Sequence, residues 1–196
     1  MASFNTHLAI AKLYAERNKV GDLAAFYKGN IDPDLTDNKD TTHYGATPNS
    51  FEHAWVRVAN KVSLSKFLKH NTLDTDLNLG RFLHLVTDQK LFYEFFGKDL
   101  LETLDHDQFT TDLYYSYVVG NPHLIKKYDL HEIDLDKIMD TSIMKEQMRN
   151  VGKRIDDMKR SNYTPKCIID VDLLDAFINK VASSDLQNIA LLVRKS

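Results

Sequence analysis

Apolar residues recur along most of this chain at intervals of three or four, the spacing of helices with one buried face. Residues 5–17 are one example, with apolar residues among good helix formers and Asn5 or Thr6 as the expected N-cap. The chain is therefore predicted to be an all-α helical bundle. Further helices are predicted at 22–28 (ending at Gly29), 49–60, 63–70, 76–97, 107–119, then, after Pro122, at 134–140, 143–159 and 171–194.

Breaks in this helical pattern are few, because the 196 residues include only seven glycines and four prolines. Residues 29–50 are dense in Asp, Asn, Thr, Pro and Gly, which is the composition of a loop. A structureless loop longer than about 12–15 residues is uncommon in a compact domain unless it is functional or disordered. The stretch NYTPKC, residues 162–167, is the expected break before the last helix. No repeat or flexible linker interrupts the chain, so residues 1–196 are predicted to form a single domain.

Charge and cysteine content narrow the classes of function. Lys and Arg total 25 against 28 Asp and Glu, with the two signs interspersed, so the sequence gives no strong signal for a nucleic-acid partner. The one cysteine, Cys167, rules out an internal disulfide and a thiolate zinc cluster. We find no leader peptide and no apolar run near the roughly 18 residues of a membrane span, and expect a soluble, cytoplasmic chain. Any metal site must be built from His, Asp and Glu.

The stretch FLHLVTDQKLFYEFF, residues 82–96, places two titratable groups in an apolar, aromatic-rich helix. His84 and Asp88 are four residues apart and therefore share one helix face, which also carries Gly80. Gly80 offers no side chain, so it leaves room for another group to approach. One interpretation is a core pair in which Asp88 accepts a hydrogen bond from His84. The other is half of a metal site, which needs more ligands from elsewhere.

Candidate partners for His84 and Asp88 occur earlier in the chain. His7 lies on the first predicted helix among apolar residues, where a buried imidazole would need polar partners. The long loop contains His43 together with Asp32 and Asp34. A metal site built from these residues would give the loop a function.

Four short motifs in this order resemble the zinc-dependent phospholipase C family, which is related to single-strand-specific zinc nucleases. They cover about the first half of the chain, and each contains a histidine or an aspartate. The resemblance implies an all-helical fold, a cluster of zinc ions and the hydrolysis of phosphodiesters. The motifs are THLAI (6–10), GNIDPDL (29–35), THYG (42–45) and FLHLVTDQ (82–89).

The resemblance also implies a role for each matching residue. Asp88 would bridge two zinc ions, one of which it shares with His7. The second ion would be held by Asp34, His43 and His84 as well. Asp34 would in addition take a proton from the attacking water. The cofactor is thus expected to be one or two zinc ions.

The chain departs from the family pattern at two points. The stretch QKLFYEFFGKDLLE after Asp88 contains no histidine, so a third zinc ion is not expected. The family also uses its mature N-terminal residue as a ligand after signal cleavage, whereas this chain starts six residues before His7 without a signal. The first site is therefore short of ligands. Asp32, Asp112, water or a substrate phosphate would have to complete it, or it is empty.

The remaining histidines are weaker candidates for a metal site than the five residues above. His106 and Asp107 resemble the dyad of the HD phosphohydrolases, but they lie where a helix should begin, which favours a capping role. We expect His53 and His70 to be packing or surface residues, and His123 and His131 to be exposed.

The chain is accordingly interpreted as a zinc-dependent phosphodiesterase acting on a small phosphodiester, a phospholipid headgroup or a nucleotide. The alternative is a non-catalytic or HD-type metal-binding helical protein with a structural His/Asp cluster.

Overall fold

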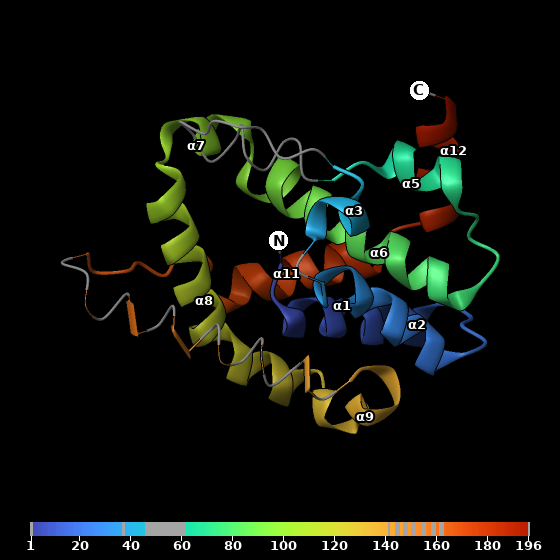
Figure 1. The fold of residues 1–196 in the computed structure, drawn as a ribbon, viewed down its shortest axis with the longest axis horizontal. Helices are drawn as coiled ribbons and strands as arrows, with labels where there is room; N and C mark the ends of the chain where they lie inside the picture. The colour runs from blue at the N-terminus through green and yellow to red at the C-terminus, as the bar shows by residue number, and fades with distance from the viewer. Residues whose placement is uncertain are drawn as a thin grey trace.

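A computed structural model of the chain describes residues 2–36, 38–45, 62–140 and 163–195, and scattered positions between 142 and 160. The described residues are mostly helical and form no strand, which confirms the all-α prediction (Figure 1). The helices predicted at 49–60 and over most of 143–159 lie outside the described residues. The elements are α1 (Phe4–Arg17), α2 (Leu23–Ile31), η1 (Asp32–Asp34), α3 (Lys39–His43), α5 (Leu64–His70), α6 (Asp76–Lys90), the π-helical turn η2 (Leu91–Phe96), α7 (Lys98–Thr103), α8 (His106–Lys127), η3 (Leu130–Glu132), α9 (Leu135–Ile138), α11 (Val171–Ala182) and α12 (Leu186–Lys195).

Helix α6 lies at the centre of the fold. Helices α1, α2, α5 and α11 all contact it, and α1 also packs against α8 and α11 (Figure 1). Phe82, Leu83 and Leu85 of α6 are completely buried, so this helix forms much of the hydrophobic core. The amino end of the chain also lies near the middle of the molecule in Figure 1, and Ala2 is buried.

The first helix begins earlier than predicted. Ser3 is its N-cap, and the Ser3 hydroxyl accepts a hydrogen bond from the backbone N–H of Thr6 at 3.1 Å. The prediction of Asn5 or Thr6 as the cap was therefore wrong. Serine is as good a capping residue as asparagine, and capping at Ser3 places buried Thr6 and His7 within the helix.

Two glycines bring helices α2 and α6 into close contact. A Cβ atom on Gly29 would lie 2.0 Å from the Leu77 carbonyl oxygen, and one on Gly80 would lie 2.1 Å from the Phe26 carbonyl oxygen. Each glycine is thus required for backbone packing. The prediction that α2 ends at Gly29 was wrong, because this helix continues to Ile31. The room left by Gly80 is filled by α2 rather than by a ligand.

The described part of the segment predicted as a long loop, residues 29–36 and 38–45, is largely helical. Residues 29–31 complete α2, Pro33 lies at the start of the 3-10 turn η1, and α3 follows after a short bend. Pro and Asp favour loops, but they also favour the first turn of a helix, and that preference prevails here. Tyr44 follows α3 in the left-handed conformation, with φ of 60°.

Helix α8 continues past Pro122 to Lys127, whereas the sequence predicted an end at residue 119. The second half of α8 is stabilised by contacts with α11 that offset the hydrogen bond lost at proline. The Asp175 carboxylate lies 2.8 Å from His123 Nε2 and 2.6 Å from Lys127 Nζ. The prediction of an exposed His123 is correct in part, because its side chain is 34% exposed but its ring is also paired with Asp175.

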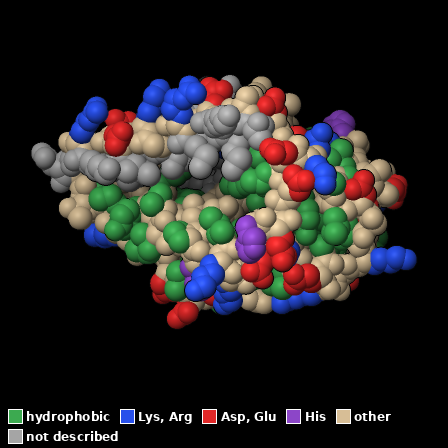
Figure 2. Space-filling view, turned by 90° about the horizontal axis from the view of Figure 1, so that it is seen from below, with side chains coloured by type: hydrophobic (Ala, Val, Ile, Leu, Met, Phe, Trp, Pro, Cys, Tyr) green, Lys and Arg blue, Asp and Glu red, His purple; other side chains and the backbone are tan. Residues whose placement is uncertain are grey.

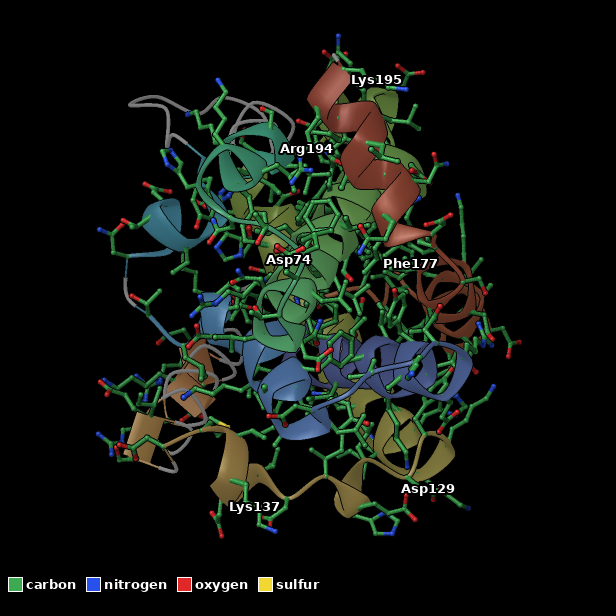
Figure 3. All side chains as sticks on the ribbon, turned by 90° about the vertical axis from the view of Figure 1, so that its right-hand side faces the viewer. Asp74, Asp129, Lys137, Phe177, Arg194 and Lys195 are labelled. Carbon is green, nitrogen blue, oxygen red and sulfur yellow. The ribbon has the colours of Figure 1, made fainter. Side chains whose placement is uncertain are left out.

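The last predicted helix is divided into α11 and α12. Asp185 ends the break by accepting a hydrogen bond from the backbone N–H of Asn188 at 3.0 Å. Helix α11 packs against α1, whereas α12 packs against α5. Figure 3 shows Arg194 and Lys195 at the outer end of α12. The predicted break at 162–167 agrees with the structure, in which residues 163–168 are not helical.

No helix among the described residues is long and apolar enough to cross a lipid bilayer. On the face drawn in Figure 2, Lys and Arg side chains alternate with Asp and Glu side chains rather than forming a broad basic surface. This mixture agrees with the net charge of −3. That face therefore lacks the electrostatic signature of a nucleic-acid binding surface.

Candidate metal centre

Five polar side chains meet in the interior beside α6. His7 comes from α1, Asp34 from η1, His43 from α3, and His84 and Asp88 from α6. These are the five residues singled out from the sequence, and the structure brings all of them together. The three imidazoles and Asp88 have exposed fractions of 1% or less, whereas the Asp34 side chain is 15% exposed. Asp34 thus marks the side of the cluster that faces solvent.

Asp88 lies at the centre of the cluster. Its Oδ1 atom accepts a hydrogen bond from the backbone N–H of Ala2 at 2.7 Å and lies 3.5 Å from His7 Nε2. Its Oδ2 atom lies 3.3 Å from His43 Nε2 and 3.6 Å from His84 Nε2. The intrahelical pair of His84 and Asp88 is therefore only one part of a larger arrangement of nitrogen and oxygen donors.

Backbone carbonyl groups fix the tautomers of two histidines. His84 Nδ1 lies 2.7 Å from the Asn30 carbonyl oxygen, and His43 Nδ1 lies 3.0 Å from the Lys39 carbonyl oxygen. A carbonyl oxygen only accepts hydrogen bonds, so both Nδ1 atoms must carry the proton. In the neutral form of each ring, Nε2 therefore has a free lone pair. This is the usual arrangement around histidines that bind metals through Nε2.

The two free lone pairs face each other. His43 Nε2 and His84 Nε2 are 3.1 Å apart, a distance at which two acceptors repel unless a proton or a metal cation lies between them. Asp88 Oδ2 lies beside both atoms and has no hydrogen-bond partner among the described residues. Three electron-pair donors thus point at one small volume, which fits a cation.

His7 is a further buried group without a hydrogen bond. Neither of its ring nitrogens has a hydrogen-bond partner among the described residues, and its ring stacks on that of His84 at a centroid distance of 3.8 Å. His7 Nε2 lies 3.9 Å from Asp34 Oδ2 and 3.5 Å from Asp88 Oδ1. Leaving a buried polar group unpaired costs about 1–3 kcal/mol. A bound cation would relieve this cost.

The donor atoms form two overlapping sets of three. His7, Asp34 and His84 make one set, and His43, His84 and Asp88 make the other, with the donors of each set within 4.8 Å of one another. His84 belongs to both sets but has only one free nitrogen, because its Nδ1 is used by Asn30. His84 can therefore bind one ion at most. A second ion would have to rely on His7 and on carboxylate oxygens.

The electrostatics of the cluster favour the metal-binding protonation states of His84, Asp34 and Asp88. Burial, followed by the neighbouring His7, lowers the pKa of His84 to about 3, so this ring is neutral near pH 7. Burial alone would raise the pKa of Asp34, but His84 and then Lys39 lower it to about 2. Burial opposes ionisation of Asp88 as well, yet the positive amino terminus of the chain holds its pKa well below the usual range. Both carboxylates are therefore charged.

Two further residues lie beside the cluster, and sequence reasoning missed the first of them. Lys39, one helical turn before His43, places its Nζ atom 2.9 Å from Asp34 Oδ1. Tyr117 of α8 is buried, and burial together with the negative charges of Asp88 and Asp34 raises its pKa well above the usual value. Lys39 could have been found from its spacing to His43, since residues four apart share a helix face.

The residues considered as extra ligands lie elsewhere. Asp32 forms an ion pair with Arg81, whose Nε donates to Asp32 Oδ2 at 3.0 Å. Asp112 accepts hydrogen bonds from the Tyr163 hydroxyl at 2.9 Å and from the backbone N–H of Lys166 at 2.8 Å. Both carboxylates are engaged outside the cluster. The proposal that they complete the first site was therefore wrong.

The His106–Asp107 dyad has the capping environment expected from the sequence. Asp105 caps α8 by accepting from the backbone N–H groups of Asp107 and Gln108, both at 2.9 Å. The Asp107 side chain is 96% exposed. This dyad therefore offers no enclosed metal site of the HD type. His53 lies outside the described residues, and His70 and His131 are exposed.

A cavity of about 430 Å³ lies next to the elements that carry Asp34 and His43. Asp32 and Thr42, close in sequence to those two ligands, belong to its wall, although the ligands themselves do not. The other lining residues are Lys28, Leu35, Thr36, Asp136, Lys137, Ile138, Met139, Asp140 and Ile143. The cavity is thus a neighbouring space with mixed charges.

No family model matches the chain, and no curated protein or solved structure matches it either. The resemblance to zinc-dependent phospholipases C rests on the four short motifs. The observed convergence of the five residues is a fact of the structure, and their role as metal ligands stays a prediction.

Proposed function

We propose that this protein is a zinc-dependent hydrolase of phosphodiesters, with the metal held by His7, Asp34, His43, His84 and Asp88. The observation that carries the proposal is the 3.1 Å separation of His43 Nε2 and His84 Nε2, whose rings both donate through Nδ1 to carbonyl groups. A cation between them would turn a repulsive contact into a binding site.

Zinc suits this donor set best. Imidazole nitrogen and carboxylate oxygen are common zinc ligands, whereas calcium and magnesium prefer sites made of oxygen alone. The carbonyl groups of Asn30 and Lys39, which accept hydrogen bonds from His84 and His43, also match the usual surroundings of zinc-binding histidines. Because the cluster contains no thiolate, copper(I) and iron–sulfur chemistry are less suitable.

A divalent cation bound here would lower the pKa of a water molecule and neutralise negative charge on a phosphoryl group. The residues of the chain supply the surroundings for that chemistry. The three buried imidazoles exclude bulk water on the inner side, and Asp34 faces the open side as a carboxylate. Asp34 is therefore placed to orient a water molecule and to accept its proton briefly. Its pKa of about 2 makes it a weak base, which favours its ligand role.

The proposed substrate is a small phosphodiester or a phospholipid headgroup. Asp34 and Asp88 carry two negative charges that one divalent ion neutralises, so a loaded site with Lys39 nearby would attract an anion. The cavity beside η1 and α3 offers space for the rest of such a molecule. Electrostatics and the resemblance thus support the same class of substrate.

A structural metal site is the second candidate, and the near-complete burial of four of the five ligands favours it. Structural zinc sites are enclosed by protein ligands, whereas catalytic sites keep a position open for water or substrate. Only Asp34 is exposed to any extent among the five. Both candidates therefore predict metal binding, but only the hydrolase predicts turnover of a phosphodiester.

Restoring zinc to chelated protein should restore turnover of bis(p-nitrophenyl) phosphate, by at least about a hundredfold over the metal-free protein. His106→Ala is the matched control, because His106 lies outside the cluster and its removal should leave the recovery unchanged. Release of p-nitrophenol is followed at several zinc concentrations. Stoichiometric zinc binding without turnover of any phosphodiester tested would favour the structural site instead.

A further inference from the structure

We infer that Lys39 is the residue that recognises the anionic phosphoryl group of the substrate at the open edge of the cluster. This inference rests on the proposed function and names the contact that selects a phosphate ester. Lys39 is the first residue of α3, and the ligand His43 is the last.

The open edge of the cluster is defined by exposure. The exposed fraction is at most 1% for His7, His43, His84 and Asp88. A molecule in solvent therefore cannot reach the cluster through these four residues. The side chain of Asp34 is 15% exposed and that of Lys39 is 35% exposed. A molecule that reaches the cluster from this side therefore meets the Lys39 ammonium group.

Two contacts hold Lys39 in place. Its carbonyl oxygen accepts the Nδ1–H of His43 at 3.0 Å, and its Nζ atom lies 2.9 Å from Asp34 Oδ1. An ammonium group has three N–H donors, so donors remain for a substrate oxygen while the contact to Asp34 persists. The backbone contact does not depend on the side chain. A change of the Lys39 side chain can thus test recognition while leaving His43 oriented.

The charges of the cluster leave the positive charge of Lys39 uncompensated once a metal is bound. Without metal, Asp34 is the partner of Lys39, with Asp88 as a second negative charge nearby. One divalent ion balances both carboxylates, because the three imidazoles contribute no charge when they bind through neutral nitrogen. A phosphodiester carries a single negative charge, which matches the charge on Lys39. Charge-assisted hydrogen bonds of this kind are stronger than neutral ones.

Lys39→Met, which keeps the apolar stem and removes the charge, should raise KM for bis(p-nitrophenyl) phosphate about tenfold and weaken inhibition by inorganic phosphate by a similar factor. Lys39→Arg should stay within about threefold of the wild type, because it keeps the charge. The matched control is Lys98→Met, since Lys98 also pairs with an acidic residue, Glu102, but lies on α7. Zinc content and the thermal midpoint are measured for each variant.

Unchanged KM and phosphate inhibition in Lys39→Met would overturn the inference, and so would a loss of zinc, which would make Lys39 a residue that positions ligands. A phosphoryl oxygen is common to soluble diesters and lipid headgroups, so a dispersed short-chain phosphatidylcholine is tested in parallel. An equal defect on both substrates supports the inference, and a defect on one substrate alone overturns it. If the wild type has no turnover, the proposed function fails, and calorimetry of inorganic phosphate with zinc-loaded wild type and Lys39→Met still tests Lys39.

Discussion

Asp88→Asn is expected to abolish measurable phosphodiester turnover and to reduce zinc content. Asp88 Oδ2 lies within 3.6 Å of two imidazole nitrogens, and Oδ1 lies 3.5 Å from a third, so the carboxylate contacts all three histidines. An amide keeps the shape but removes the charge and one acceptor oxygen. The loss should exceed about a hundredfold, since even the outer partners of metal ligands contribute about 10–100-fold to affinity or activity. Steady-state kinetics and elemental analysis measure the two effects.

Asp112→Asn is the matched control for this substitution. Asp112 is also a buried aspartate, but its oxygens accept from Tyr163 and Lys166 rather than from the cluster. This variant should lose stability and keep both zinc and turnover. If Asp88→Asn instead keeps zinc and turnover and loses only about 1–3 kcal/mol of unfolding free energy, the His84–Asp88 pair is structural.

Zinc should raise the melting temperature of metal-free protein by about 10 °C. Among the described residues, the native cluster holds buried groups without hydrogen-bond partners, whereas the unfolded chain offers no such preformed site. A ligand at about a thousand times its Kd stabilises the native state by about 4 kcal/mol, and about 1 kcal/mol corresponds to about 2–4 °C for a chain of this length. Circular dichroism melts with zinc and with chelator measure the shift.

The same experiment shows where zinc acts. Chelation should reverse the rise without unfolding the helical core, because the apolar side chains of α6 pack independently of the metal. Hydrogen exchange should increase mainly in residues 32–43, which carry Asp34 and His43, whereas α6 should stay protected. Asp88→Asn should reduce the zinc-induced shift. A melting temperature that is unchanged at a large excess of zinc would contradict a site that couples to folding.

Much of the fold follows from local sequence patterns, and the exceptions have tertiary causes. Helices α1 and α6 carry regular apolar spacing, and their existence was predictable. The extension of α8 past Pro122 depends on Asp175, which is 53 residues away in sequence and only becomes a neighbour on folding. Gly29 favours a helix end when read locally. Glycine is required at this position by the close contact with the Leu77 carbonyl group, which local sequence could not predict.

The positions in the candidate site were more predictable than its surroundings. His84 and Asp88 stood out because their spacing places two titratable groups on one face of an apolar helix. His7, His43 and Asp34 were candidate partners from their positions, and the resemblance selected Asp34 over Asp32. The carbonyl groups of Asn30 and Lys39 fix the histidine tautomers. Because every residue has a backbone carbonyl group, the residue types at these positions could not predict this role. Gly80 was linked correctly to a close approach, although the group that approaches is the backbone of α2.

The zinc content of purified protein shows whether the cluster binds a metal. The protein is prepared without chelator, incubated with zinc, passed through a desalting column and analysed for metal against its concentration. About one to two equivalents are expected, because the donors form two overlapping sets and His84 can serve only one ion. A content below about a tenth of an equivalent after incubation with zinc would contradict metal binding by the cluster.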